Sequence, residues 1–175
     1  MYIRRLNESD LSLRVRWMNH PKIYLSMHLD LPISLENTRK WYQVNINNST
    51  RVDLVFEDSE GEPIAMGGFT AISSWTRKAE LYIFVNPDLQ TRGIGTRVIT
   101  LLCKYAFEIL NLHKIYLYTN ETNVAAQKVY EKNGFKLEGR LRDELYVNER
   151  YETRLYYGLL LNDFKALESQ LIFMG

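Results

Sequence analysis

The chain of 175 residues is 46% hydrophobic and 25% charged, a composition typical of soluble globular proteins. Its 22 basic and 21 acidic residues leave a net charge of +1, which excludes the strongly basic surface of non-specific nucleic-acid binders. No apolar run approaches the roughly 20 residues of a membrane span, and the first residues lack a signal-peptide core. The single cysteine, Cys103, cannot form an internal disulfide. We therefore expect one cytoplasmic domain over residues 1–175, with no nucleic-acid or membrane partner.

The first part of the chain predicts one strand and two helices. Residues 2–6 read as a short strand, and apolar residues at helical spacing predict a helix over residues 11–18, capped by Ser9 or Asp10 and bounded by the following proline. A second helix is expected to begin after Ser34, which forms an imperfect capping box with an asparagine three residues later.

The middle of the chain is predicted to be a sheet. Residues 52–56, 64–69 and 80–85 show the composition of strands, and residues 58–62 that of a hairpin turn. The glycine pair at positions 67 and 68 interrupts a strand pattern, which indicates either a bulge or something that lies close to the backbone.

The remainder alternates between helix and strand. Helical periodicity covers residues 93–110, with Cys103 among its apolar positions, and again residues 124–132, where Asn133 and Gly134 form a C-cap. Strands are expected at residues 114–118, 135–137 and 151–157. The alternation of helices and strands along the chain predicts a mixed α/β domain.

Gly93, Ile94 and Gly95 open the long helix after a strand that ends at Val85 and a short polar loop. A helix start leaves backbone N–H groups without internal partners, and glycines allow an anion to approach them closely. A Rossmann fingerprint needs a glycine where Val98 stands, and the P-loop's Gly-Lys-Ser/Thr ending is missing from the sequence. The glycines by themselves leave two alternatives open, a tight turn or an anion site.

The surrounding sequence carries a family resemblance. Gln90 stands three residues before the first of these glycines, and the later run 123–135 has the asparagine, tyrosine and Gly-Phe ending of a second motif. With residues 110–117 and 135–142, these stretches resemble the acetyl-CoA signature of the GNAT superfamily of N-acetyltransferases. The likeness is specific over residues 80–157, and it is closest to the ribosomal-protein and spermidine acetyltransferase branch.

The resemblance implies a fold and a cofactor. The fold is a central mixed sheet of six to seven strands, with splayed fourth and fifth strands and about four flanking helices. Residues 80–135 would form the acetyl-CoA core, residues 1–50 mainly the acceptor side, and residues 162–175 a C-terminal tail. The residues that would hold acetyl-CoA are Ile83, Phe84, Val85, Gln90, Arg92, Gly93, Ile94, Gly95, Thr96, Asn123, Ala126, Tyr130 and Lys132.

Two catalytic roles follow from the same resemblance. Tyr130 matches the family's tyrosine that protonates the departing thiolate; without the motif it would read as a core aromatic residue on a helix. Glu80 is the candidate base for the attacking amine, directly or through water, because an amine is an ammonium ion at neutral pH. A solvated glutamate at a strand start is the alternative. Transfer would proceed by direct attack in a ternary complex.

The acceptor stays open at this stage. Trp17, His28, Trp75 and Tyr146 are the candidate substrate-binding residues. A polyamine is one alternative, an amino-sugar nucleotide is another because residues 16–21 resemble acetyltransferases of that kind, and a protein N-terminus is a third. A CoA-binding module without activity is the alternative from another class. The histidines lack metal-ligand spacing, so no metal is expected, and the apolar tail would pack on its own domain or on a second subunit in a homodimer.

Overall fold

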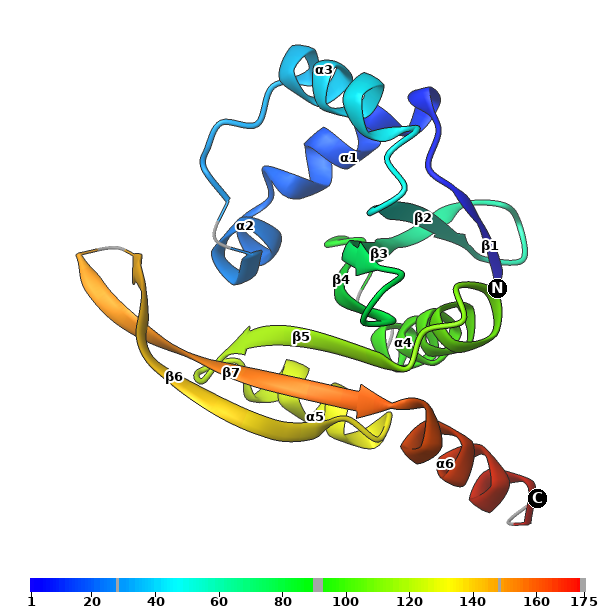
Figure 1. Ribbon diagram of the computed structural model, residues 1–175. Coiled ribbons are helices and arrows are strands. Elements are labelled where there is room, and N and C mark those ends of the chain that lie inside the picture. The colour runs from blue at the N-terminus through cyan, green and yellow to red at the C-terminus, as the bar shows by residue number, and fades with distance from the viewer. Residues whose placement is uncertain (28, 90–92, 148, 174–175) are drawn as a thin grey trace. The chain divides into compact units, whose positions relative to one another are not determined.

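The computed structural model describes residues 1–27, 29–89, 93–147 and 149–173, and side chains through residue 167 (Figure 1). A short 3₁₀ turn (Glu8–Asp10) precedes the first helix, and a π-helix (Tyr105–Ile109) follows the fourth. The strands and helices are β1 (Tyr2–Arg5), α1 (Leu11–Met18), α2 (Pro21–Met27), α3 (Leu35–Asn45), β2 (Val52–Glu57), β3 (Pro63–Ser73), β4 (Lys78–Val85), α4 (Ile94–Lys104), β5 (Lys114–Asn120), α5 (Val124–Lys132), β6 (Lys136–Val147), β7 (Arg150–Leu160) and α6 (Leu161–Phe173).

The strands neighbour one another in the order β1-β2-β3-β4-β5-β7-β6. The sheet is mixed, because β4 and β5 run parallel whereas β5, β7 and β6 pair antiparallel, so the predicted mixed α/β class is confirmed. The described residues form six α-helices rather than about four. Helix α2 was not predicted: Pro21 bounds α1, but proline also suits the first turn of a helix, and α2 begins at this residue.

The chain divides into two compact units, which share β3 and β4. The first unit comprises residues 1–70 and 82–95, and the second comprises residues 71–81 and 96–175. None of the helices in the described part of the chain is both long and apolar enough to cross a membrane.

The first unit is built on β1, β2 and β3 with helices α1 to α3. One core cluster joins α1 to the sheet through Trp17, which is fully buried and meets Phe84 edge to face at 6.3 Å between ring centroids. Gly68 explains the predicted glycine pair: a Cβ there would lie 1.9 Å from the carbonyl oxygen of Val52 on β2. The close neighbour expected from the sequence is therefore the adjacent strand.

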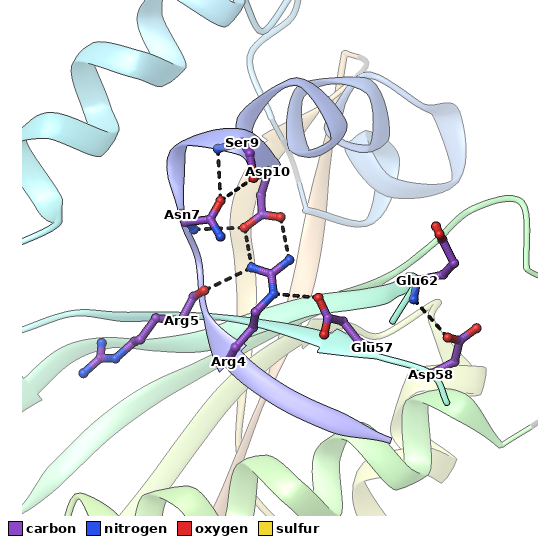
Figure 2. Close-up of polar contacts among 8 residues, drawn as sticks. All are labelled: Arg4, Arg5, Asn7, Ser9, Asp10, Glu57, Asp58 and Glu62. Carbon is purple, nitrogen blue, oxygen red and sulfur yellow. Dashed lines mark hydrogen bonds and ion pairs between the residues drawn. The ribbon is translucent and has the colours of Figure 1, made fainter. Parts of the chain in front are cut away.

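A polar network fixes the start of α1 to β1 (Figure 2). Asn7 caps the 3₁₀ turn, since its side chain accepts from the Ser9 N–H at 3.0 Å and its own N–H donates to Asp10 at 2.9 Å. Arg4 donates to both carboxylate oxygens of Asp10, at 2.7 and 2.8 Å, and to Glu57 at 2.6 Å. Asp10 stands at the N-cap position of α1, as one of the two predicted alternatives, but its side chain makes no capping hydrogen bond to that helix, because Arg4 and the Asn7 N–H hold it instead.

Replacing Asp10 by Asn is expected to lower the free energy of unfolding by about 2 kcal/mol at neutral pH. Burial acts to raise the pKa of Asp10, but the hydrogen bonds from Arg4 and Asn7 outweigh it and hold that pKa below its usual value. Such a carboxyl stabilises the fold above its unfolded-state pKa and loses this contribution as the pH falls through the folded-state pKa. Urea unfolding should therefore show a difference at pH 7 that shrinks as the pH falls below the ordinary aspartate pKa of 3.8. Exposed Glu8→Gln is the control; an equal effect of both changes would contradict the role of the network.

In the second unit, β5 is the central strand. Its residues Ile115 and Leu117 are buried, and it pairs antiparallel with β7 along its whole length. Its parallel ladder with β4 joins only Lys78–Glu80 to Lys114–Tyr116, after which β4 continues into the first unit. The expected splay of β4 and β5 remains a prediction. Helix α4 buries Cys103, as its apolar surroundings predicted.

Candidate active site

The glycines at the start of α4 leave open space beside the first turn. Gly93 has φ +93°, and a Cβ built on it would meet no atom within 4 Å; the nearest atom to one on Gly95 is Val85 Cγ2, at 4.0 Å. The amides of a helix start are anion donors, and these two positions let a phosphate reach them. The site therefore fits a diphosphate group. Gln90 and Arg92, expected beside it, lie outside the described residues.

Ile94 and Thr96 flank Gly95 in the first turn of α4. Ile94 is the first residue of α4 and is buried, which anchors the turn to the core. Thr96 accepts a hydrogen bond through its carbonyl from the Thr100 hydroxyl at 3.0 Å, while the Thr100 hydroxyl also donates to Asn133 at 2.7 Å. Thr100 thus links α4 to Asn133 at the end of α5 within the second unit.

On β4, side chains alternate between the two faces. Phe84 is buried, and Ile83 and Val85 are half-buried, so the main chain of this segment is the part a ligand would reach. At its end, the Asn86 N–H donates to the Ile64 carbonyl at 2.9 Å. The expected pairing of residues 83–85 with the pantetheine arm remains a prediction.

Helix α5 begins and ends where the sequence predicted. The Asn123 side chain accepts from the Ala126 N–H at 3.1 Å and caps the helix, so a contact between Asn123 and pantetheine would use its amide nitrogen. Gly134, with φ +85°, follows the last turn. Lys132 in that turn is exposed.

Tyr130 lies on α5 against β7. Its ring centroid is 6.0 Å from Phe135 and 6.2 Å from Tyr157, and the Tyr157 hydroxyl donates to Glu131 at 2.9 Å. Burial raises the pKa of Tyr130 to about 12. The phenol is therefore protonated at neutral pH, as a proton donor to a thiolate must be.

Glu80 lies on β4 opposite Tyr116 of β5, in the same unit as Tyr130. It is half-buried, and this burial raises its pKa above the usual value of 4.5, whereas the positive charge of Arg154 acts in the opposite direction. A carboxylate with a raised pKa is a better proton acceptor near neutral pH than a fully solvated one. The environment of Glu80 therefore suits a general base.

The candidate acceptor residues have different environments. The expected role of Trp17 in acceptor binding is corrected by the structure. With 0% of its surface exposed, Trp17 is a core residue and presents no face to a substrate. Trp75, in the turn between β3 and β4, is 93% exposed, and Tyr146, near the tip of the β6–β7 hairpin, is 64% exposed. Tyr146 contacts Tyr151 with 5.0 Å between centroids. Both exposed aromatics stay predictions, and His28 lies outside the described residues.

Sequence reasoning missed a cluster of arginines and aromatics in the first unit. Arg14 is 5% exposed, its guanidinium lies 4.7 Å from the Trp41 ring, and its Nη1 has no hydrogen-bond partner within the described chain. Arg51 lies 4.8 Å from the same ring and pairs with Asp53 at 2.8 Å. Asp53 also accepts from the hydroxyl of Tyr82, whose pKa burial raises to about 12. These residues come from separate elements of the chain, so no local sequence pattern connected them.

Comparison with known proteins agrees with this architecture. The family described as "Acetyltransferase (GNAT) domain" matches residues 1–136. Spermidine N(1)-acetyltransferase of Vibrio cholerae serotype O1 is 31% identical over 151 residues, which cover 86% of this chain and 87% of the relative. Acetyltransferase PseH of Campylobacter jejuni is 30% identical over 145 residues, 81% of this chain and 87% of that protein.

A solved structure extends the likeness to three dimensions. The crystal structure of spermidine N-acetyltransferase from Vibrio cholerae in complex with CoA and spermine has a TM-score of 0.90 at 29% identity. The match covers 94% of this chain and 97% of that one. The family match, the shared fold and an α4 start that fits a diphosphate agree with one another, so the chain belongs to the GNAT acetyltransferase family and is an acetyl-CoA-dependent N-acetyltransferase.

Proposed function

We propose that the chain transfers the acetyl group to a primary amine of a small molecule, by direct attack of the amine in a ternary complex. The observation that carries this proposal is the environment of Glu80: a half-buried carboxyl with a raised pKa, beside a group of tyrosines on the sheet. Tyr130 in the same unit supplies a phenol that stays protonated at neutral pH. Together they provide a proton acceptor and a proton donor for amine acetylation.

The cofactor supplies the acetyl group as a thioester. Glu80 takes a proton from the acceptor ammonium, directly or through water, because only the neutral amine has a lone pair for attack. As the carbon–sulfur bond breaks, the Tyr130 hydroxyl gives its proton to the leaving sulfur. The transfer thus needs proton movement at two separate places, one at each side of the thioester.

Backbone groups would hold the cofactor. The amides around Gly93 and Gly95 face the diphosphate in this proposal, and the main chain of residues 83–85 and the Asn123 amide bind the pantetheine arm. Main-chain binding of an extended ligand to a strand is an established mode of recognition.

Two small-amine classes are supported. Relatives named as spermidine acetyltransferases favour a polyamine, and the likeness of residues 16–21 to amino-sugar-nucleotide acetyltransferases favours a sugar. The test is a screen of polyamines, amino sugars and their nucleotides, amino acids, aminoglycosides and peptide N-termini, read by thiol release from acetyl-CoA. Acetylation of small amines is expected. Activity confined to peptides would overturn the small-molecule proposal, and CoA binding without any transfer would indicate a regulatory module.

Changing Glu80 to Gln is expected to lower kcat about 100-fold and to remove the acid limb of its pH profile. In the wild type the rate should rise as the pH passes upward through the pKa of Glu80, because the base acts in its ionised form. Since burial raises this pKa, ionised Glu80 destabilises the folded state above that pKa, and the Gln variant should be no less stable at pH 7. An unchanged pH profile would show that another group or bulk water takes the proton.

A further inference from the structure

Three tyrosines of the second unit form a continuous aromatic surface, which we call the tyrosine face. It consists of Tyr116 and Tyr118 on β5 and Tyr156 on β7, with ring centroids 5.2 to 6.0 Å apart. Glu80 adjoins it, since Glu80 pairs with Tyr116 in the sheet, and burial followed by the charge of Glu80 raises the pKa of Tyr116. An amine that reaches Glu80 therefore lies beside these rings.

Each ring of the tyrosine face already has a cation of the chain beside it. Lys78 Nζ lies 5.8 Å from the centre of Tyr116, and Lys114 Nζ lies 5.5 Å from that of Tyr156. The guanidinium carbon of Arg154 lies 4.6 Å from the centre of Tyr118. The rings are thus not free to act as a cage for a further cation.

Most carboxylates near the tyrosine face are paired within the chain. Glu138 pairs with Lys114. The Glu138 side chain lies against Gly158 of β7, where an added Cβ would overlap the Glu138 carboxylate. Glu152 accepts from Asn120 at 3.0 Å and lies 3.6 Å from Arg150. Neither carboxylate is available to a second ammonium group without loss of these contacts.

Two cations and one carboxylate at the tyrosine face are not part of these ion pairs. In the part of the chain that the structure describes, Lys78 and Arg154 make no ion pair, and the Nε of Arg154 is buried without a hydrogen-bond partner. The carboxylate is Glu80, which feels the charge of Arg154 but is not hydrogen-bonded to it. Once Glu80 is used by the acceptor amine, Arg154 has no counter-ion left.

We propose that the acceptor amine carries an anionic group, a carboxylate or a phosphate, and that Arg154 binds this group while Glu80 faces the amine. This rests on the proposed function, which it narrows from small amines to anionic ones. A buried guanidinium nitrogen without a partner is costly, and a charge-assisted hydrogen bond to the acceptor would satisfy it. A second ammonium would instead meet Arg154 and Lys78, so a polyamine is the poorer acceptor.

The positions of the two groups set the spacing in the acceptor. Glu80 is level with Tyr116, whereas the Arg154 guanidinium lies over Tyr118, two residues further along β5. Two residues of strand rise about 7 Å. The amine and the anion are therefore expected about 7 Å apart, at opposite ends of a compact acceptor such as an amino acid with a separated carboxylate or an amino-sugar phosphate.

Matched acceptors test the proposal on the unaltered protein. Butylamine, putrescine and 4-aminobutyrate share a four-carbon chain, with a neutral, cationic or anionic far end; glucosamine and glucosamine 6-phosphate form the phosphate pair. Thiol release should give a kcat/KM for 4-aminobutyrate or glucosamine 6-phosphate at least about tenfold above its uncharged partner, with putrescine lowest. The two pairs separate carboxylate from phosphate recognition. A kcat/KM for putrescine equal to or above that for 4-aminobutyrate, with no gain from phosphate, overturns the proposal.

Variants locate the preference. At a pH at which Glu80 is ionised in both proteins, Arg154→Gln should raise KM for the anionic acceptors about tenfold and that for butylamine far less, whereas Arg154→Lys should restore part of the preference. Arg150→Gln, two positions before Glu152 on the same strand, is the matched control and should change neither. A loss that is equal for all three four-carbon acceptors would mean that Arg154 is structural.

Binding separates failure of this inference from failure of the proposed function. Calorimetric titration of the CoA-bound protein with the same three four-carbon compounds needs no turnover. Tighter binding of 4-aminobutyrate without any thiol release would support the anion site and contradict amine acetylation. Tighter binding of putrescine would overturn the anion site even if small amines are acetylated.

Discussion

Tyr130→Phe is expected to lower kcat at least about 100-fold while the affinity for CoA stays within about twofold of the wild type. The ring of Tyr130 packs between Phe135 and Tyr157, and phenylalanine keeps that packing. Only the hydroxyl is lost. Since burial raises its pKa to about 12, this hydroxyl is a neutral donor throughout the physiological range, and a departing thiolate then has to leave without a proton.

Tyr157→Phe is the matched control for this change. Tyr157 also has its pKa raised by burial to about 12, and its ring lies 6.2 Å from that of Tyr130, but its hydroxyl already donates to Glu131. Thiol release measures kcat and calorimetry measures CoA affinity. If the two variants lose the same activity, the effect of Tyr130 is one of packing and its role as proton donor is wrong.

The sequence predicted elements best where both ends carry local signals. Helix α5 begins and ends as expected because Asn123 caps its start and Asn133 and Gly134 its end. Helix α1 begins at residue 11 as expected, but the predicted side-chain cap is not made, because the Asp10 carboxylate is held by Arg4 of β1. A capping residue can thus mark a helix end correctly even when its side chain forms its hydrogen bonds elsewhere.

The strands of the β6–β7 hairpin are longer than the sequence predicted. Residues 135–137 and 151–157 were expected as strands, whereas β6 runs over Lys136–Val147 and β7 over Arg150–Leu160. Half of the additional residues of β6 are charged, and the alternation of half-buried Leu141, Leu145 and Val147 is interrupted by exposed Asp143, so the strand pattern is weak. Their hydrogen bonds to β7 hold them, and β6 as the edge strand has no second neighbour to require an apolar face.

Only those parts of the candidate site that are marked by local sequence patterns were predictable. The glycine start of α4 and the Tyr130 motif are continuous in sequence and were found there. The relation of Arg154 to the tyrosine face depends on the register that places Tyr118 opposite Tyr156, and a single sequence does not encode that register locally. Trp17 was assigned to the acceptor because tryptophan suits both binding clefts and cores; its burial against Phe84 decided for the core.

Gly95→Trp is expected to weaken CoA binding more than about 100-fold, measured by calorimetry. The space beside the first turn of α4 is open, since a Cβ at Gly95 would meet only Val85 Cγ2 at 4.0 Å. An indole there would occupy the space through which the diphosphate reaches the helix amides, and it would exclude those charge-assisted hydrogen bonds.

Gly95→Ala separates this steric effect from any effect on the helix. A methyl group fits the same space without displacing an atom, and alanine in place of glycine within a helix stabilises it by about 0.5–1 kcal/mol. CoA affinity of the Ala variant should therefore remain close to that of the wild type, and its thermal stability should be equal or higher. If the Trp variant is folded and still binds CoA normally, the diphosphate does not lie at this turn. If the Ala variant loses as much affinity as the Trp variant, glycine is required there for its backbone and not for the space beside it.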